Sequence, residues 1–196
     1  TVPFNLRVLG GADRVIMGQA IGGQTETDAW ALFGQIDYAL TPDLKLVFGL
    51  RYSEEDKHMD EYAQFDTVRT YSPSNPIIPN RTQSIDGSWS AWTPKLTLEY
   101  QPQDNLFLYG TISRGFKSGG FNVGGMQAPF EPEMIWNYEA GLKADWFDRT
   151  LRTNLTAFHY DYSDLQVTKV VGNVITTVNA AEAVIRGIEG EISWIA

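Results

Sequence analysis

The stretch WALFGQIDYALTPDLKLVFGLRY, Trp30 to Tyr52, holds two runs of alternating residues joined by a short turn. In each run, apolar side chains occupy every second position, and polar or small side chains dominate the positions between them. This is the pattern of a two-faced β-strand. Thr41-Pro42-Asp43 supplies residues that turns prefer. The stretch therefore predicts a pair of antiparallel strands with one apolar side.

The same alternation recurs along the chain, in Trp92–Tyr100, Leu106–Ile112 and Trp136–Trp146. A long run from Leu151 to about Val170 then reverses near Gly172-Asn173 and returns through Ile175 to Trp194. We predict an all-β chain, an antiparallel meander of about seven or eight strands, the eighth being in the first twenty-odd residues.

Short and long connections alternate in the sequence. The connections at Pro42, Pro102 and Asp148 are tight, whereas Lys57–Gly87 and Ser118–Met134 are long polar excursions. This alternation is typical of outer-membrane barrels, which have short periplasmic turns and long extracellular loops. Two alternatives stay open: a soluble sandwich that buries its apolar side beneath a second sheet, and a complete small barrel of about eight strands.

The apolar side of the predicted strands often ends in Tyr or Trp, which is typical of the aromatic girdles where lipid meets water. The candidate girdle residues are Trp30, Tyr38, Tyr52, Trp92, Tyr100, Trp136, Trp146 and Trp194. The charged side chains between them are expected to face the lumen. These lumen-facing candidates are Lys45, Arg51, Lys95, Glu99, Glu139, Lys143, Glu189 and Glu191.

Composition excludes several kinds of function. A net charge of −9 disfavours nucleic acid as a partner, and the absence of cysteine excludes disulfides, thiolate zinc sites and a cysteine nucleophile. No run of about 18 apolar residues predicts a transmembrane helix. The strand pattern does not favour Glu139, Glu189 and Glu191 as the paired carboxylates of a glycosidase. It favours a ladder of alternating charge, in which these carboxylates face the lumenal cations of neighbouring strands. We expect neither enzymatic activity nor a cofactor.

SRGFKSGGF, Ser113 to Phe121, combines two cationic side chains with three glycines. A P-loop would need a glycine directly before Lys117 and a helix after it, and neither is present. We interpret the stretch as the outer end of a strand, where glycine lets the backbone bend. Arg114 shares the parity of the apolar side, so it lies above the apolar band or follows a bulge. Arg114, Lys117 and Asn122 are candidate rim or loop residues.

Two histidines complete the set of candidates. His58 lies in SEEDKHMDEY, a segment dense in carboxylates that suits either a cation contact or a solvated loop. His159 lies on a predicted strand and is interpreted as structural or interfacial.

YGTISRGFKSGGFN, FEPEMIWNYEAGLKADWFDRTLRTNLTAFHYDYSDLQV and VNAAEAVIRGIEGEISW occur in this order. Together with DAWALFGQIDYALTPDLKLVFGLRYSEEDK they resemble the barrel of TonB-dependent outer-membrane receptors, especially iron-complex receptors of the pesticin-receptor type. The resemblance implies a plugged barrel of about 22 strands in the outer membrane of a Gram-negative bacterium. It also implies uptake of ferric siderophores or similar complexes, contact with outer-membrane lipid, and energy from TonB.

The chain lacks the plug domain and the TonB box of that family, and both of its ends look cut. We therefore expect residues 1–196 to be a partial barrel domain, without the plug and the remaining strands. Within it, Glu54–Asn80 and Ser118–Glu133 are the loop segments expected to come nearest to the ligand.

Overall fold

The computed structural model describes residues 16–69, 81–171, 174–180 and 182–195, and these residues form nine strands. The strands are β1 (Ile16–Thr41), β2 (Leu44–Arg69), β3 (Arg81–Gln103), β4 (Leu106–Lys117), β5 (Glu133–Trp146), β6 (Leu151–Ser163), β7 (Gln166–Val171), β8 (Val174–Asn179) and β9 (Ala183–Trp194). No helix in this described part of the chain has the length and apolar character needed to cross a membrane as a helix.

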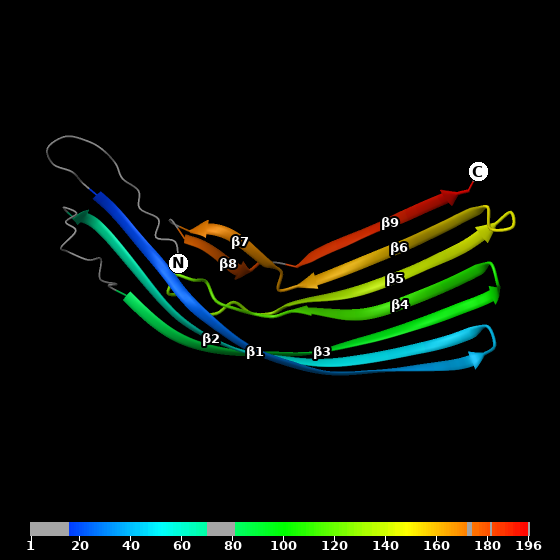
Figure 1. Ribbon diagram of the computed structural model, residues 1–196, viewed down its shortest axis with the longest axis horizontal. Helices are drawn as coiled ribbons and strands as arrows, with labels where there is room; N and C mark the ends of the chain where they lie inside the picture. The colour runs from blue at the N-terminus through cyan, green and yellow to red at the C-terminus, as the bar shows by residue number, and fades with distance from the viewer. Residues whose placement is uncertain (1–15, 70–80, 172–173, 181, 196) are drawn as a thin grey trace.

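Seven strands form one antiparallel sheet in the order β1-β2-β3-β4-β5-β6-β9 (Figure 1). β7 and β8 form a separate hairpin between β6 and β9. The predicted all-β meander is therefore confirmed, with seven strands in the wall and two in the hairpin. Within the described residues, β1 and β9 are the two open edges of the sheet, so this part of the chain does not close into a small barrel.

The strand registers separate the side chains onto two faces, because successive residues of a strand point to opposite sides. One row of paired residues crosses the whole sheet and carries no charge: Tyr38, Leu46, Leu98, Gly110, Ala140, Ala157 and Ile188. The adjacent row alternates with it and is largely polar: Ala39, Lys45, Glu99, Tyr109, Gly141, Thr156 and Glu189. We call the side of the first row the apolar face and the side of the second row the polar face.

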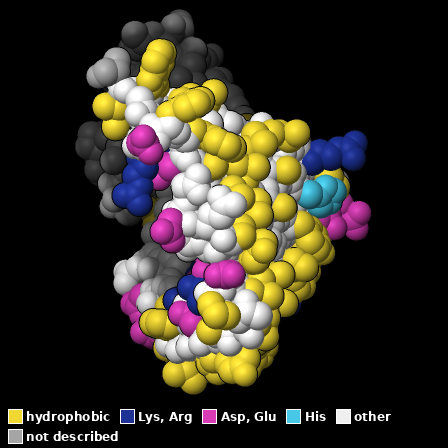
Figure 2. All heavy atoms as spheres, turned by 90° about the vertical axis from the view of Figure 1, so that its right-hand side faces the viewer, with side chains coloured by type: hydrophobic (Ala, Val, Ile, Leu, Met, Phe, Trp, Pro, Cys, Tyr) yellow, Lys and Arg dark blue, Asp and Glu magenta, His cyan; other side chains and the backbone are white. Residues whose placement is uncertain are grey.

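The apolar face is exposed along its length. Ile36 is 68% exposed, Leu32 72% and Ile192 75%. Figure 2 shows hydrophobic side chains gathered along one side of the curved wall and most of the charged side chains in view on the hollow side, apart from one small cluster of cationic, imidazole and acidic side chains that projects from the hydrophobic side. The sheet of the described residues is a single layer, and the alternative of a soluble sandwich is wrong because no second sheet covers these side chains.

The short connections lie together at one end of the sheet, and β1, β2 and β3 extend far beyond the other strands at the opposite end (Figure 1). The predicted excursion Lys57–Gly87 is therefore mostly strand, since β2 continues to Arg69 and β3 begins at Arg81. The residues between them lie outside the described part. No separate strand precedes β1 within the described residues, because β1 itself begins at Ile16.

The run from Leu151 to Val170 is divided, contrary to the prediction of one continuous strand. Asp164 has a φ of 56°, in the left-handed region, and ends β6. The amide of Ala180 donates to the carbonyl oxygen of Leu165 at 2.8 Å, which closes the base of the β7–β8 hairpin. The predicted reversal at Gly172-Asn173 falls on residues outside the described part.

Candidate functional site

All eight lumen-facing candidates lie on the polar face by strand register. Lys45 forms an ion pair with Glu99 at 2.7 Å. The hydroxyl of Tyr109 donates to Glu139 at 2.6 Å, and the amide of Asn154 donates to Glu191 at 3.1 Å. In the described part of the chain, the expected ladder of lysines against Glu139 and Glu191 is therefore replaced by neutral donors.

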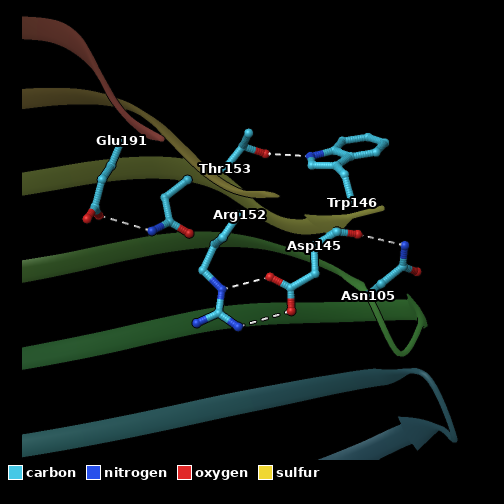
Figure 3. Close-up of polar contacts among 7 residues, drawn as sticks. Asn105, Asp145, Trp146, Arg152, Thr153 and Glu191 are labelled. Carbon is cyan, nitrogen blue, oxygen red and sulfur yellow. Dashed lines mark hydrogen bonds and ion pairs between the residues drawn. The ribbon is translucent and has the colours of Figure 1, made fainter. Parts of the chain in front are cut away.

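Sequence reasoning missed an ion pair near the short connections. The guanidinium of Arg152 donates to both carboxylate oxygens of Asp145, at 2.7 and 3.0 Å (Figure 3). Trp146 points to the other side of the sheet in the same view, where its indole N–H donates to the hydroxyl of Thr153 at 2.9 Å. Two neighbouring residues of β5 thus serve opposite faces, a charged one and an amphipathic aromatic one.

All eight girdle candidates lie on the apolar face, and they fall into two levels. Tyr38, Tyr100, Trp146 and Trp194 lie near the short connections, and Trp30, Tyr52, Trp92 and Trp136 lie further along the strands. On the outer level, the ring of Tyr52 lies 5.3 Å from that of Trp30 and 4.8 Å from that of Trp92.

The separation of the two levels suits a membrane. The distance from Trp136 to Trp146 is about 33 Å along the strand at roughly 3.3 Å per residue. At a strand tilt of about 40°, this corresponds to a band about 25 Å tall, the height of the apolar band of outer-membrane barrels. On β1 to β6, the apolar face carries no Asp, Glu, Lys or Arg side chain between the two levels.

The glycines of SRGFKSGGF allow a close approach of the loop to the polar face. β4 continues in register to Lys117, which pairs with Glu133. Beyond it, Gly119 is buried, and a Cβ there would lie 2.4 Å from the indole nitrogen of Trp89 and 2.5 Å from the carbonyl oxygen of Phe130. The next residue, Gly120, forms a β-bridge with Phe130. The stretch is thus a strand end followed by an inward-folded loop.

Lys57 of β2 holds this loop, residues 118–132, in place. Its ammonium group donates to the carbonyl oxygen of Gly119 at 2.8 Å, pairs with Glu55 at 3.0 Å and lies 5.5 Å from the ring centre of Trp89. Burial raises the pKa of the Glu55 carboxyl, but hydrogen bonding, chiefly from Lys57, outweighs this and leaves that pKa lowered. The loop is therefore attached through a charged group rather than left in solvent.

Asn122 connects the loop to the β7–β8 hairpin. Its side-chain oxygen accepts from the amide of Thr177 at 2.6 Å, and its amide nitrogen donates to the carbonyl oxygen of Thr177 at 2.9 Å. The amide of Gly124, at a φ of 79°, donates to Glu61, which is 3% exposed. Asn122, predicted as a rim or loop residue, lies in this loop and is buried at 7% exposure.

The other two rim candidates differ from Asn122. Lys117 is exposed. Arg114 lies on the apolar face without a bulge, because β4 and β5 pair in unbroken register from Leu106 to Lys117. Its guanidinium lies 5.9 Å from the ring centre of Trp136, on the outer aromatic level. Of the two interpretations of Arg114, a position above the apolar band is therefore the one the register supports.

His58 lies among carboxylates on strand β2, not in a loop. Its Nδ1 lies 2.7 Å from Asp86 and its Nε2 3.5 Å from Asp60. The hydrogen bond with Asp86, followed by the charge of Asp60, raises the pKa of His58 above 6.5. Within the described residues, no group of acidic or imidazole ligands is arranged to hold a metal ion.

We predict that the contact between His58 and Asp86 makes the stability of the folded structure depend on pH. A raised folded-state pKa stabilises the structure below the unfolded-state value of 6.5, and this contribution is lost as pH rises through the higher folded-state value. An NMR titration of the full-length protein should give His58 a pKa above 6.5, and Asp86→Asn should lower it. An unchanged His58 titration in Asp86→Asn would contradict the prediction.

A single-layer meander with an exposed apolar band, two aromatic levels and a charged opposite face is the architecture of a transmembrane β-barrel wall. Residues 4–195 match the family model "TonB dependent receptor-like, beta-barrel". The chain belongs to this family of receptor barrels.

Three known proteins are similar to the chain. The pesticin receptor of Yersinia enterocolitica is 26% identical over 176 residues, which cover 88% of this chain and 24% of the relative. The metal-pseudopaline receptor CntO of Pseudomonas aeruginosa is 36% identical over 80 residues, covering 40% of this chain and 11% of the relative. The crystal structure of the ferric yersiniabactin uptake receptor FyuA from Yersinia pestis superposes with a TM-score of 0.73 at 19% identity, covering 90% of this chain and 25% of that chain. The chain thus spans a quarter or less of the length of these proteins.

Proposed function

We propose that the chain is part of the wall of an outer-membrane receptor that imports ferric siderophores or similar iron complexes. The observation that carries this proposal is the membership of the chain in the receptor-barrel family. The two faces of the wall support it, since the apolar face suits outer-membrane lipid and the charged face suits a hydrated lumen. The location that follows is the outer membrane of a Gram-negative bacterium.

The wall carries out no bond chemistry in this proposal. The ligand binds on the outer side, passes through the lumen, and is driven by TonB acting on a plug domain of the parent receptor. The eight charged candidates line the passage, and the eight aromatic candidates anchor the wall at the two lipid–water interfaces. Nucleic acid is not a partner, in keeping with the net charge of −9.

The inward-folded loop and the β7–β8 hairpin are the parts that we place nearest to the ligand. Lys57, Glu61 and Asn122 hold backbone groups of both segments at fixed positions on the polar-face side of the wall. A preorganised loop binds more tightly than a mobile one because less conformational entropy is lost on binding. Within Glu54–Asn80, the residues up to Arg69 contribute as strand rather than as loop.

Radioactive iron uptake by cells that express the full-length receptor tests the function. The probes are ferric complexes of catecholate, hydroxamate and phenolate-thiazoline siderophores. Cells with the receptor should accumulate iron from at least one class only when TonB is present. A receptor that reaches the outer membrane but binds none of these complexes would contradict the proposal.

Asn122→Ala should weaken binding of the transported complex by up to about thirtyfold, because both hydrogen bonds to Thr177 are lost and each is worth roughly 1 kcal/mol. Binding is measured by tryptophan fluorescence with the purified receptor. Lys169→Ala, a change of an exposed residue on the same hairpin, is the matched control and should bind as the unchanged receptor does. Equal affinities of the two variants would contradict the placement of this loop next to the ligand.

A further inference from the structure

The apolar face contains a furrow that spans β4, β5 and β6. Its floor consists of the small residues Gly110, Ala140 and Ala157, which are paired in one row. Two adjoining hollows of about 600 and 420 Å³ share this floor and Leu98 as lining. They extend from Tyr138 and His159 at the outer level toward the short connections, so together they form one apolar furrow along the strands.

Cationic side chains flank the outer end of this furrow. Arg186 of β9 is the cross-strand partner of His159, which itself lines the furrow. Arg114 of β4 lies against Trp136, whose ring is 6.5 Å from that of Tyr138, and the ring of Tyr138 is 6.0 Å from that of His159. Four adjacent strands thus carry a belt of two guanidiniums and one imidazole, linked by aromatic rings.

The charges of this belt are not neutralised by neighbouring side chains. Neither Arg114 nor Arg186 forms an ion pair with another described residue. The Nε atom of Arg114 is buried and has no hydrogen-bond acceptor within the described part. Asp161, a carboxylate on the same face of β6, pairs with Trp136 in the row of Arg114, one row further out than His159 and Arg186, and forms no ion pair with either arginine. The belt therefore presents donors to a ligand in the membrane interface.

The positive charge of the belt contrasts with the negative charge found elsewhere on the same face. The same face beyond Trp30, Tyr52 and Trp92 is largely acidic on β1, β2 and β3, where His58 is surrounded by Glu26, Asp28, Glu54, Asp56 and Asp86. On this face of the described wall, guanidinium groups occur only at the outer end of the furrow, and in a chain of net charge −9 they favour an anion that is joined to an apolar body.

We propose that this furrow binds a phosphate-bearing lipid of the outer leaflet, with the phosphate at Arg114, His159 and Arg186 and one acyl chain extending along the strands over the floor of Gly110, Ala140 and Ala157. Guanidinium groups recognise phosphate with paired hydrogen bonds, and long cationic side chains near the membrane surface reach toward the headgroups. The apolar floor selects a lipid over free phosphate. The inference rests on the membrane placement in the proposed function and adds a specific lipid site to it.

Native mass spectrometry of the full-length receptor tests this site with two lipids of identical chains, phosphatidic acid and phosphatidylcholine. We expect about a tenfold preference for phosphatidic acid. Arg114→Gln/Arg186→Gln should abolish the preference, whereas Arg51→Gln, which removes one charge from the polar face, should retain it. Both sets of changes are on exposed or half-exposed residues, so folding should be preserved.

Two further measurements test the acyl-chain contact and the preference for a lipid over free phosphate separately. Ala157→Leu should weaken binding of long-chain phosphatidic acid about tenfold and leave a dibutyryl analogue unaffected, because only the long chain needs the furrow. Millimolar inorganic phosphate should not displace the lipid. Displacement by inorganic phosphate, or loss of the preference in Arg51→Gln as well, would overturn the site.

Quenching of tryptophan fluorescence by phosphatidylcholine with brominated chains separates this inference from the proposed function. Quenching without a preference for phosphatidic acid overturns the lipid site alone and leaves the membrane placement standing. Absence of quenching overturns both.

Discussion

Ile36→Lys should destabilise the full-length receptor by about 1–2 kcal/mol in bilayers, between the cost of a lysine on the lipid face at the midplane and its cost at the interface, because Ile36 lies two residues from Tyr38. Ile36 lies on the apolar face of β1, between the aromatic levels of Trp30 and Tyr38, and is 68% exposed. In lipid, an ammonium group at this position has no water or counter-ion within reach. Urea unfolding of the receptor in bilayers measures the difference.

Gln35→Lys is the matched control for Ile36→Lys. It places the same charge one residue away, on the polar face of the same strand, where Gln35 already donates to Asp37 at 3.0 Å. We expect a change within about 0.5 kcal/mol, as for other surface substitutions. Equal costs for the two lysines would show that the two faces of the wall have the same surroundings, and the membrane assignment would fail.

Gly119→Ala should lower ligand affinity by tenfold or more. The new Cβ would lie 2.4 Å from the indole nitrogen of Trp89 and 2.5 Å from the carbonyl oxygen of Phe130, so loop 118–132 has to move away from the wall. Overpacking of this kind costs about 1–3 kcal/mol. The loss of the loop position also removes the acceptor of the Lys57 ammonium group, the Gly119 carbonyl oxygen at 2.8 Å.

Gly34→Ala is the control for the glycine change. A Cβ at Gly34 would meet no atom within 4 Å, so the added methyl group should leave affinity and stability unchanged. Calorimetric titration of the purified receptor with the transported complex measures both variants, and outer-membrane amounts of each show whether assembly is intact. An unchanged affinity of Gly119→Ala would contradict the role that we give to the loop.

The two faces of the wall could be predicted from the sequence because a strand alternates its side chains with a period of two, and this period is a local property. Leu96 and Lys95, for example, reveal their opposite sides without knowledge of their partners. The turn at Pro42 is equally local. The length of β2 was hidden, however, because its outer part, from Glu54 to Arg69, is polar on both sides and resembles a loop.

The contacts of the inward-folded loop could not be predicted. Lys57 and Gly119 are 62 positions apart, Glu61 and Gly124 are 63 positions apart, and no motif links either pair. Gly119 and Gly120 indicated a bend of the backbone at the end of the strand, but not the close approach to Trp89. Likewise, Ser163-Asp164 is a weak turn signal within the run, and it did not reveal the left-handed residue that ends β6.

The unequal heights of the strands affect what can touch the cell from outside. Beyond Tyr52, β2 continues to Arg69, a length of roughly 55 Å at about 3.3 Å per residue. With β1 and β3 it forms a ridge that stands higher than β4, β5 and β6 (Figure 1). In the proposed outer-membrane location, an antibody or a phage tail fibre would contact this ridge first. A small chelate would instead reach the lumen over the shorter strands β4, β5 and β6. Substitutions at the outer end of the ridge would then alter recognition by such large particles and leave uptake of the small chelate unchanged.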